Sequence, residues 1–203
     1  MCSDGSEGRC GARLQPDGVE YERWSEGATD YAREHYERVL LDGLPECAAV
    51  LDLGCGSGVL LTRRLAERFH VTGVELSSHM FDLARRNVPN VAFVHGDMAS
   101  IGFPAQSFDG VCAFYSLTHV PLEELPNLLH RAAWLRLGGL FVASMGNGAD
   151  PGSVQDDWVA GVPMYFASYT AEKNEELVQE AELCVTSARL ETVHEQGGDV
   201  TFL

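Results

Sequence analysis

The stretch VLDLGCGSG at residues 50–58 decides the fold of this chain. Its first half, VLDL, is an apolar run interrupted by one acid, Asp52, as expected of a buried β-strand. Its second half places glycine at every second position, at Gly54, Gly56 and Gly58. A residue without a Cβ tolerates positive φ and lets a ligand approach the main chain closely. We therefore expect a strand that ends in a sharp, ligand-binding turn with exposed backbone amides.

The spacing of these glycines separates two classes of ligand loop. Dinucleotide-binding folds use GxGxxG at the start of a helix, where the helix N-terminus binds pyrophosphate. Here the third glycine comes one residue early, and Val59 stands where that pattern requires glycine. GxGxG after the acidic strand end at Asp52 instead resembles the first motif of class I S-adenosylmethionine-dependent methyltransferases. In that family, the loop wraps the nucleoside and the methionine of the cofactor.

Three further segments follow in the order of this family. HVTGVE at residues 70–75 predicts a second strand, and its final Glu75 is expected to bind the ribose hydroxyls. VAFVHGDM at residues 91–98 delivers an acid and a methionine to the loop that holds the adenine. FDGVCAFYSLTHV at residues 108–120 predicts a fourth strand, with His119 beyond it. The resemblance spans about half of the chain and implies these cofactor-binding residues: Tyr21, Tyr31, Asp52, Gly54, Cys55, Gly56, Glu75, Leu76, Met80, Asp97, Met98 and Phe114.

The order of these elements predicts an α/β fold, a doubly wound Rossmann-like sheet with helices on both faces. Ser77 is suited to be the N-cap of a helix that runs through Asn87. Pro126 should kink the helix expected over residues 122–136 or restart it. The tight turn at Gly197 and Gly198 predicts an antiparallel pair at the end of the chain. As in the family, we expect seven strands, with the last one antiparallel beside the fifth.

Length and composition favour a single domain. A chain of 203 residues with 45% hydrophobic residues can bury a substantial core. Residues 1–18 are rich in glycine, serine and charge, so we expect a disordered tail before a domain at residues 19–203. Residues 19–46 should contain a helix that covers the cofactor, with Tyr31, or failing that Tyr21, on the methionine carboxylate. The alternative is that these aromatic residues only pack the helix on the sheet.

The connection at residues 146–169 is too long for a simple turn. Pockets in open α/β sheets lie at the carboxyl ends of the strands, so we expect a lid-like segment that contacts the methyl acceptor. Aromatic side chains that only pack inward are the alternative interpretation. The candidate substrate-binding residues are Trp158, Met164, Tyr165 and Tyr169.

The expected chemistry needs few catalytic groups. A sulfonium methyl is already activated for in-line displacement, so the protein must mainly align the acceptor and exclude water. If the acceptor is a phenol, a hydroxyl or an amine, His119 is the candidate base, because histidine titrates near neutral pH. Its alternative role is to support the cofactor pocket by hydrogen bonding. The six cysteines lack metal-type spacing, so we expect no metal, and Cys55 is expected to be a small loop residue rather than a nucleophile.

Charge and hydropathy limit the partners. The net charge of −16, from 14 Lys and Arg against 30 Asp and Glu, disfavours a nucleic acid partner. No apolar run is long enough for a membrane span, and no signal segment opens the sequence. We expect a cytoplasmic enzyme that uses S-adenosylmethionine to methylate an O, N or C nucleophile of a small molecule. The alternatives are a non-catalytic S-adenosylmethionine-binding partner protein and a dinucleotide-dependent oxidoreductase. Nothing in the sequence indicates an oligomeric state.

Overall fold

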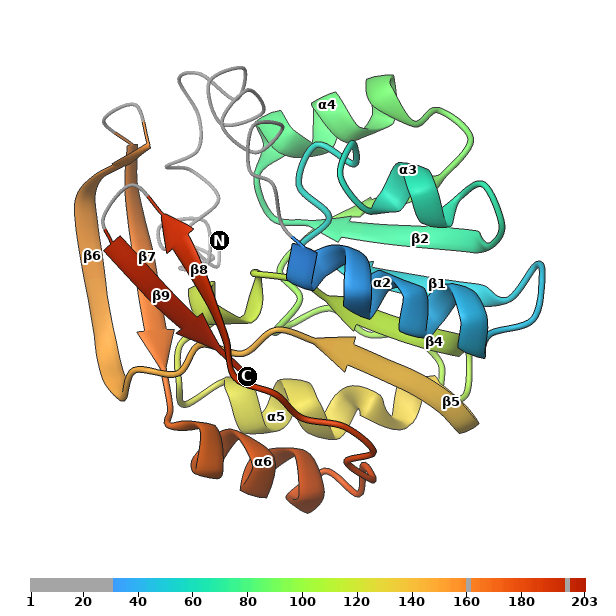
Figure 1. Cartoon of the computed structure of the whole chain (residues 1–203). Helices are drawn as coiled ribbons and strands as arrows, with labels where there is room; N and C mark the ends of the chain where they lie inside the picture. The colour runs from blue at the N-terminus through green and yellow to red at the C-terminus, as the bar shows by residue number, and fades with distance from the viewer. Residues whose placement is uncertain (1–30, 160–161, 196–197) are drawn as a thin grey trace, which may run out of the picture.

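The computed structural model describes residues 31–159, 162–195 and 198–203 (Figure 1). A parallel sheet of five strands forms the centre, in the order β3-β2-β1-β4-β5. Because β1 and β4 are neighbours, the chain first builds outward from β1 and then returns across it. The strand order therefore reverses at the carboxyl ends of β1 and β4, where ligands bind in such sheets. The five strands are β1 (Ala49–Leu53), β2 (His70–Glu75), β3 (Ala92–His95), β4 (Phe108–Ala113) and β5 (Leu135–Ala143).

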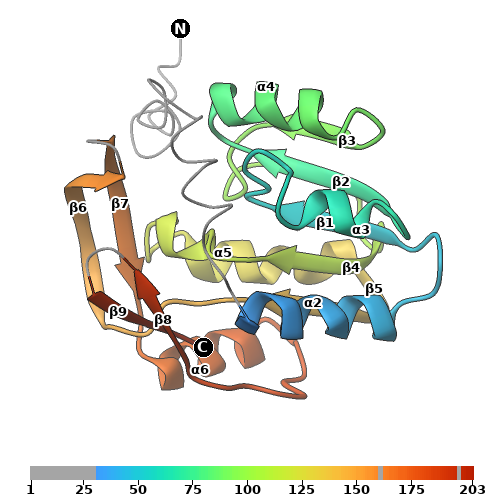
Figure 2. The ribbon, with the colours of Figure 1, turned by 45° about the horizontal axis from the view of Figure 1, so that its top comes forward.

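Helices cover both faces of this sheet, as the sequence predicts (Figure 2). Residues of one strand alternate between the two faces, which are both buried here. Leu51 and Leu53 of β1 pack in the hydrophobic cluster shared with α5 and α6, whereas Val50 packs in the cluster shared with α2 and α3. The helices are α2 (Tyr31–Gly43), α3 (Thr62–Leu65), α4 (Ser78–Asn87), α5 (Leu125–His130) and α6 (Ala171–Glu180).

Helix α2 lies within the segment predicted to cover the cofactor. Leu40 of α2 and Leu44, just after its end, are buried in one hydrophobic cluster with Val50 of β1. Glu37, 1% exposed, forms an ion pair with Arg64 of α3, with 2.9 Å between Oε1 and Nε. A buried carboxylate needs such a partner because burial removes its hydration. Packing and charge pairing thus hold α2 on the α3 face of the sheet.

Asp52 also faces this side of the sheet. Its carboxylate is 2% exposed and accepts a 2.6 Å hydrogen bond from Oγ1 of Thr62, the first residue of α3, which is completely buried. Cys112 of β4 places its sulfur 3.7 Å from the other carboxylate oxygen. Asp52 therefore joins the end of β1 to the start of α3 across the glycine turn.

The structure tests two predictions about helix starts. Ser77 is the N-cap of α4, since its hydroxyl accepts a hydrogen bond from the amide of Met80, as predicted. Of the two alternatives predicted at Pro126, the structure shows a new helix start rather than a kink, because α5 begins at Leu125 and places the proline in its first turn. The missing N–H of proline costs no helical hydrogen bond at that position.

Two antiparallel hairpins stand beside the sheet at the same side of the molecule (Figure 1). The first comprises β6 (Asp150–Val159) and β7 (Val162–Ser168), and the second comprises β8 (Glu191–Glu195) and β9 (Gly198–Phe202). The predicted single sheet of seven strands is therefore corrected to five strands. The end of the chain does reach the segment after β5 in antiparallel fashion, through a bridge between Gly146 and Phe202 and two main-chain hydrogen bonds between Met145 and Leu203. The main-chain groups of β8 and β9 otherwise pair within their own hairpin.

No helix among the described residues is long and apolar enough to cross a membrane. Within the same residues, no group of three or more His, Cys, Asp or Glu side chains could hold a metal ion.

We predict that Thr62→Val destabilises the protein. The substitution keeps the shape of the side chain but removes the hydroxyl that donates to the buried Asp52. Hydrogen bonds to charged groups contribute about 1.5–3 kcal/mol, and each kcal/mol shifts the melting temperature of a chain of this size by about 2–4 °C. Thermal denaturation should show this loss, whereas the control Thr62→Ser should lose less. Equal melting temperatures for Thr62→Val and the parent would contradict the anchoring role of Asp52.

Candidate functional site

The turn after β1 has the geometry that its glycines predict. Gly54, Gly56 and Gly58 have φ angles of +73°, +57° and +76°, where L side chains are strained. A Cβ on Gly54 would also lie 2.4 Å from the Cβ of Ser116, in the loop after β4. The turn is thus packed directly against the carboxyl end of β4.

The amides of this turn are used inside the protein. Those of Gly54 and Cys55 donate to the carbonyl of Val74, at 2.9 and 3.0 Å. The amide of Gly56 donates to Oε2 of Glu75, at 2.9 Å. The expectation that the turn exposes its amides is therefore wrong for these three groups. Because these three amides already donate within the protein, they do not form a binding site for an anion. This argues against the pyrophosphate of a dinucleotide as the ligand.

Glu75 occupies the centre of the site, at the end of β2. It is 8% exposed, and its second oxygen accepts the amide of Ser77, at 2.8 Å. Burial raises the pKa of the Glu75 carboxyl, and the hydrogen bonds from main-chain amides oppose this shift. A carboxylate has about four acceptor positions, so these oxygens can accept further hydrogen bonds from a ligand.

Two methionines flank the glycine turn. The terminal methyl of Met98 lies 3.1 Å from the Cβ position of Gly54, and that of Met80 lies 3.8 Å from the Cβ position of Gly56. Met80 is buried in the first turn of α4, whereas Met98 is only partly buried after β3. These methionines therefore form an apolar border around the turn.

The loop after β3 reaches the same edge of the sheet, because Glu75 pairs in register with His95. Two residues further on, Asp97 accepts the amide of Ala99 at 2.8 Å and stabilises its own turn. Nε2 of His95, at the end of β3, lies 2.9 Å from the carbonyl oxygen of Leu76, and this contact connects the ends of β2 and β3. The structure thus brings Leu76 and Asp97 close to Glu75.

Two other predicted cofactor residues, Cys55 and Phe114, pack against neighbouring elements of the fold. Cys55 points its sulfur toward β2, 2.9 Å from the Cβ position of Gly73. Burial and the nearby Asp52 and Glu75 carboxylates raise the pKa of the Cys55 thiol well above its usual range, which disfavours the thiolate that a nucleophile requires. Phe114, partly buried, packs against the hydrophobic cluster shared with α2 and α3.

Three predicted residues cannot be located in the site. Tyr21 lies outside the described residues. Tyr31 is the first residue of α2, and Trp158 lies in β6, but the side chains of both are outside the described part of the structure.

The loop after β4 contains features that the sequence did not indicate. Tyr115 has a φ of +55°, a conformation that costs a non-glycine residue on the order of 1 kcal/mol. Its amide donates to Oγ of Ser144, and its ring contacts Phe202 edge-on, with 4.9 Å between centroids. Ser116 donates to the carbonyl of Leu53 at 2.7 Å. The loop is therefore held by contacts with β1, the residue after β5 and the last strand, which lie far apart in sequence.

His119 ends the short 3₁₀ helix η1 (Leu117–His119), just beyond this loop. Its Nδ1 lies 2.8 Å from the carbonyl oxygen of Tyr165 in β7, and its ring contacts Phe166 at a centroid distance of 4.9 Å. Burial of the imidazole lowers the pKa of His119, and the hydrogen bond to Tyr165 opposes this shift. Part of the residue surface nevertheless stays exposed. Burial therefore favours the neutral form of the His119 imidazole.

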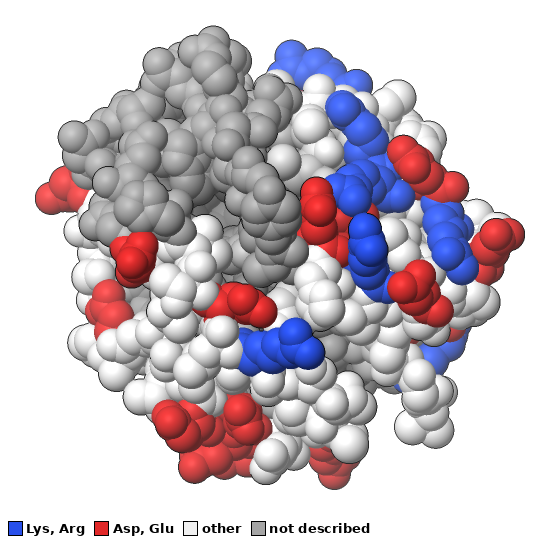
Figure 3. All heavy atoms as spheres, in the orientation of Figure 1, with Lys and Arg blue, Asp and Glu red and all other residues white. Residues whose placement is uncertain are grey.

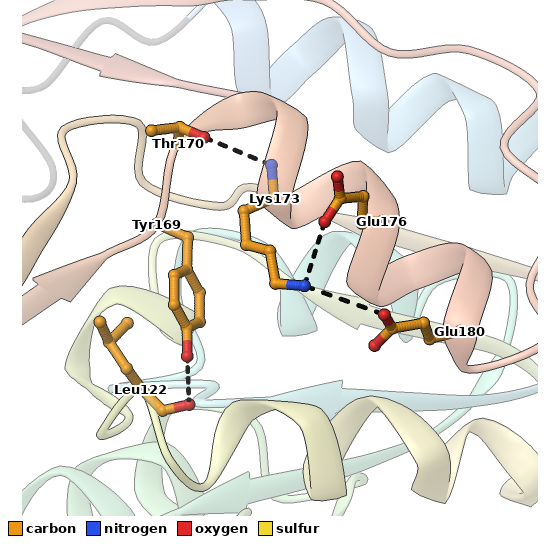
Figure 4. A network of polar contacts seen from close by, with 6 residues as sticks. All are labelled: Leu122, Tyr169, Thr170, Lys173, Glu176 and Glu180. Atoms are coloured by element: carbon orange, nitrogen blue, oxygen red, sulfur yellow. Dashed lines mark hydrogen bonds and ion pairs between the residues drawn. The ribbon is translucent and has the colours of Figure 1, made fainter.

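The predicted substrate residues of β7 and its end divide into two groups. Tyr165 accepts the hydrogen bond of His119 through its main chain, while its hydroxyl lies against Gly152 of β6. Met164 is 1% exposed and belongs to the core. Tyr169 packs against the cluster shared with α5 and α6, and its hydroxyl donates to the carbonyl of Leu122 at 3.2 Å (Figure 4). Of these three residues, Tyr165 is thus the one that contacts His119, through its main-chain carbonyl.

Comparison with known proteins gives a consistent result. Residues 50–139 match the family described as a methyltransferase domain. A curated relative, dTDP-3-amino-3,6-dideoxy-alpha-D-glucopyranose N,N-dimethyltransferase from Streptomyces fradiae, is 37% identical over 108 residues, 51% of this chain and 42% of the relative. Demethylmenaquinone methyltransferase from Staphylococcus aureus is 31% identical over 113 residues, 52% of this chain and 46% of the relative. The matches span less than half the length of these relatives.

Solved structures share the fold over most of the chain. A methyltransferase from Methanosarcina mazei has a TM-score of 0.69 at 18% identity and covers 81% of this chain and 93% of its own. The 1,6-didemethyltoxoflavin-N1-methyltransferase from Burkholderia thailandensis, solved with S-adenosylhomocysteine, has a TM-score of 0.65 at 23% identity and covers 100% of this chain and 88% of its own. With the strand order and the motifs at β1, β2 and β3, these findings identify residues 50–139 as a methyltransferase domain and show that the chain has the fold of S-adenosylmethionine-dependent methyltransferases.

Proposed function

We propose that this protein transfers the methyl group of S-adenosylmethionine to an O, N or C nucleophile of a small molecule. The observation that carries the proposal is the buried Glu75 carboxylate, which faces the glycine turn and lies at the same sheet edge as His119. Three relatives are named for the methylation of a sugar nucleotide, demethylmenaquinone and didemethyltoxoflavin, which supports a small acceptor.

The side chains around Glu75 fit the parts of the cofactor. The carboxylate of Glu75 would accept from both ribose hydroxyls, the role that acids at this strand end have for nucleotide riboses. Asp97 would accept from the adenine amine, and Met98 would cover the ring. Leu76, Met80 and Phe114 would complete the apolar wall, and the main chain of the turn would lie along the nucleoside. Tyr31 or Tyr21 remains the predicted ligand of the methionine carboxylate.

The chemistry assigned to the protein is alignment, exclusion of water and removal of one proton. S-adenosylmethionine supplies a methyl group that is already activated for displacement. His119 would act as the general base for a protic acceptor, because burial lowers its pKa and so favours the neutral imidazole. The β6–β7 hairpin would form the acceptor side of the site, since the main chain of Tyr165 in β7 contacts His119.

Charge supports a small acceptor rather than a nucleic acid. The net charge is −16, and the face in Figure 3 mixes basic with acidic side chains instead of showing a continuous basic stripe. Phosphate backbones bind to clustered Lys and Arg. Location in the cytoplasm stays a prediction.

Isotope transfer tests the proposed activity directly. Metabolite extracts are incubated with the protein and S-adenosylmethionine labelled in the methyl group, and products are searched by mass spectrometry. A labelled small molecule that forms only with the active protein supports the proposal. Tight cofactor binding without a labelled product in any extract would instead favour a non-catalytic cofactor-binding protein.

We predict that Glu75→Gln weakens S-adenosylmethionine binding roughly ten- to a hundredfold. Hydrogen bonds to charged acceptors contribute about 1.5–3 kcal/mol each, and 1.4 kcal/mol corresponds to a factor of ten. Calorimetry measures the affinity, with the exposed Glu67→Gln as the control. A folded Glu75→Gln protein that binds within about twofold of the parent, less than one such bond is worth, would refute the ribose assignment.

The same carboxylate gives cofactor binding a pH dependence. Because burial raises the pKa of Glu75, protonation should weaken binding at a higher pH than the ordinary glutamate value of about 4.3. Affinity should therefore fall as the pH falls through the raised pKa, and Glu75→Gln should lack this step.

We predict that His119→Ala lowers turnover by roughly two to four orders of magnitude, the usual contribution of a general base. Cofactor affinity should change little, because the proposed contact is with the acceptor. In the parent, turnover should fall only below about pH 6.5, since burial lowers the pKa of His119 from that value. His130→Ala is the control, because this exposed histidine also places Nδ1 2.8 Å from a carbonyl. A loss of affinity before any loss of turnover would show that His119 supports the cofactor pocket instead.

We predict that Tyr165→Phe and Tyr169→Phe have different effects. Tyr165 belongs to the proposed acceptor side of the site, with its hydroxyl against Gly152 of the β6–β7 hairpin, so loss of this hydroxyl should alter turnover or the choice of acceptor while cofactor affinity stays the same. The hydroxyl of Tyr169 donates a hydrogen bond to the carbonyl of Leu122. Loss of this hydroxyl should lower the free energy of unfolding by about 0.5–1.5 kcal/mol with little change in kinetics. Acceptor profiles and thermal melting measure the two effects. Identical kinetics for Tyr165→Phe across acceptors would remove this phenol from the site.

A further inference from the structure

The hydrogen bond between His119 and β7 determines which nitrogen of the imidazole carries hydrogen. Nδ1 lies 2.8 Å from the carbonyl oxygen of Tyr165. A carbonyl oxygen can only accept, so Nδ1 must be the donor. In a neutral imidazole the lone pair then belongs to Nε2.

The position of this carbonyl is fixed by the hairpin. Its neighbours along β7 include Met164 and Ala167, which are 1% and 3% exposed, so the strand is anchored in the core. Tyr165 pairs in register with Val154 of β6. The ring of Phe166 contacts the imidazole at an interplanar angle of 61°, which further restricts its orientation.

We propose that β7 positions the base of the reaction: the main-chain carbonyl of Tyr165 holds His119 in the Nδ1–H form, so that Nε2 receives the proton of the acceptor. The inference rests on the proposed function, and it makes Tyr165 a positioning residue through its backbone. It also specifies the acceptor as a nitrogen or oxygen nucleophile that carries a proton.

The proton balance of the step follows from this arrangement. The nucleophilic atom of the acceptor forms a bond to the methyl carbon as the bond between that carbon and sulfur breaks, and the sulfur keeps the electron pair. The proton of the acceptor passes to Nε2 of His119. The resulting imidazolium still donates from Nδ1 to the Tyr165 carbonyl, whose partial negative charge stabilises the new positive charge.

Nitrogen NMR tests the tautomer without any turnover. The protein is labelled with ¹⁵N-histidine, and the signals of His119 among the seven histidines are assigned by their loss in His119→Asn. We expect a protonated Nδ1 and an unprotonated Nε2 in the neutral protein. The reverse tautomer, or an average of both, would overturn the proposal.

Two amide substitutions then separate positioning from proton transfer. In His119→Asn, the side-chain amide nitrogen can take the place of Nδ1 and donate to Tyr165, but nothing replaces Nε2. In His119→Gln, the amide nitrogen reaches the place of Nε2 and the bond to Tyr165 is lost. We expect His119→Asn to melt close to the parent and His119→Gln to melt lower, while both lose roughly two to four orders of magnitude in turnover.

The outcomes distinguish this inference from the proposed function. Turnover retained in His119→Asn would overturn the role of Nε2, and equal melting of the two variants would overturn the anchoring by Tyr165. If the parent binds S-adenosylmethionine but methylates no acceptor, the proposed function fails. The tautomer and the melting comparison would still decide whether β7 orients His119.

Discussion

The site depends on one buried carboxylate. Glu75 accepts the amide of Gly56 on one oxygen and the amide of Ser77 on the other, at 2.9 and 2.8 Å. These bonds attach the glycine turn after β1 to the start of α4, where Ser77 is also the N-cap. The cost of burying the charge is offset by these bonds, because main-chain amides favour the ionised form. The Glu75 carboxylate can therefore hold the glycine turn against the start of α4 and also accept hydrogen bonds from a ligand.

The pKa values of Glu75 and His119, two titratable groups of the site, are both shifted in the direction that favours the neutral form. Burial raises the pKa of Glu75 and lowers the pKa of His119. Hydrogen bonds to the main chain oppose each shift, since amides stabilise the carboxylate and the Tyr165 carbonyl stabilises the imidazolium. Both side chains are thus largely removed from water, and each is hydrogen-bonded to the main chain. Such surroundings suit a reaction that must exclude water and move one proton.

Segments distant in sequence complete this edge. Tyr115 keeps its positive φ while its amide bonds to Ser144 and its ring contacts Phe202 of the last strand. His119 in turn depends on β7, which is anchored by its buried Met164. The hairpins outside the central sheet therefore contribute to the site by holding residues that follow β4.

Sequence patterns determined the features that rest on local chemistry. Glycine spacing predicted the positive-φ turn, apolar runs predicted the strands, and Ser77 predicted the start of α4, because each depends on residues close together in the chain. The sequence predicted the antiparallel pair at the end of the chain, but not that this pair lies outside the central sheet. It also could not predict that the turn amides bond to Val74 and Glu75, or that Tyr115 takes a left-handed conformation. Those features, like the tautomer of His119, depend on contacts between distant segments, and only the tertiary structure decides which polar groups meet there.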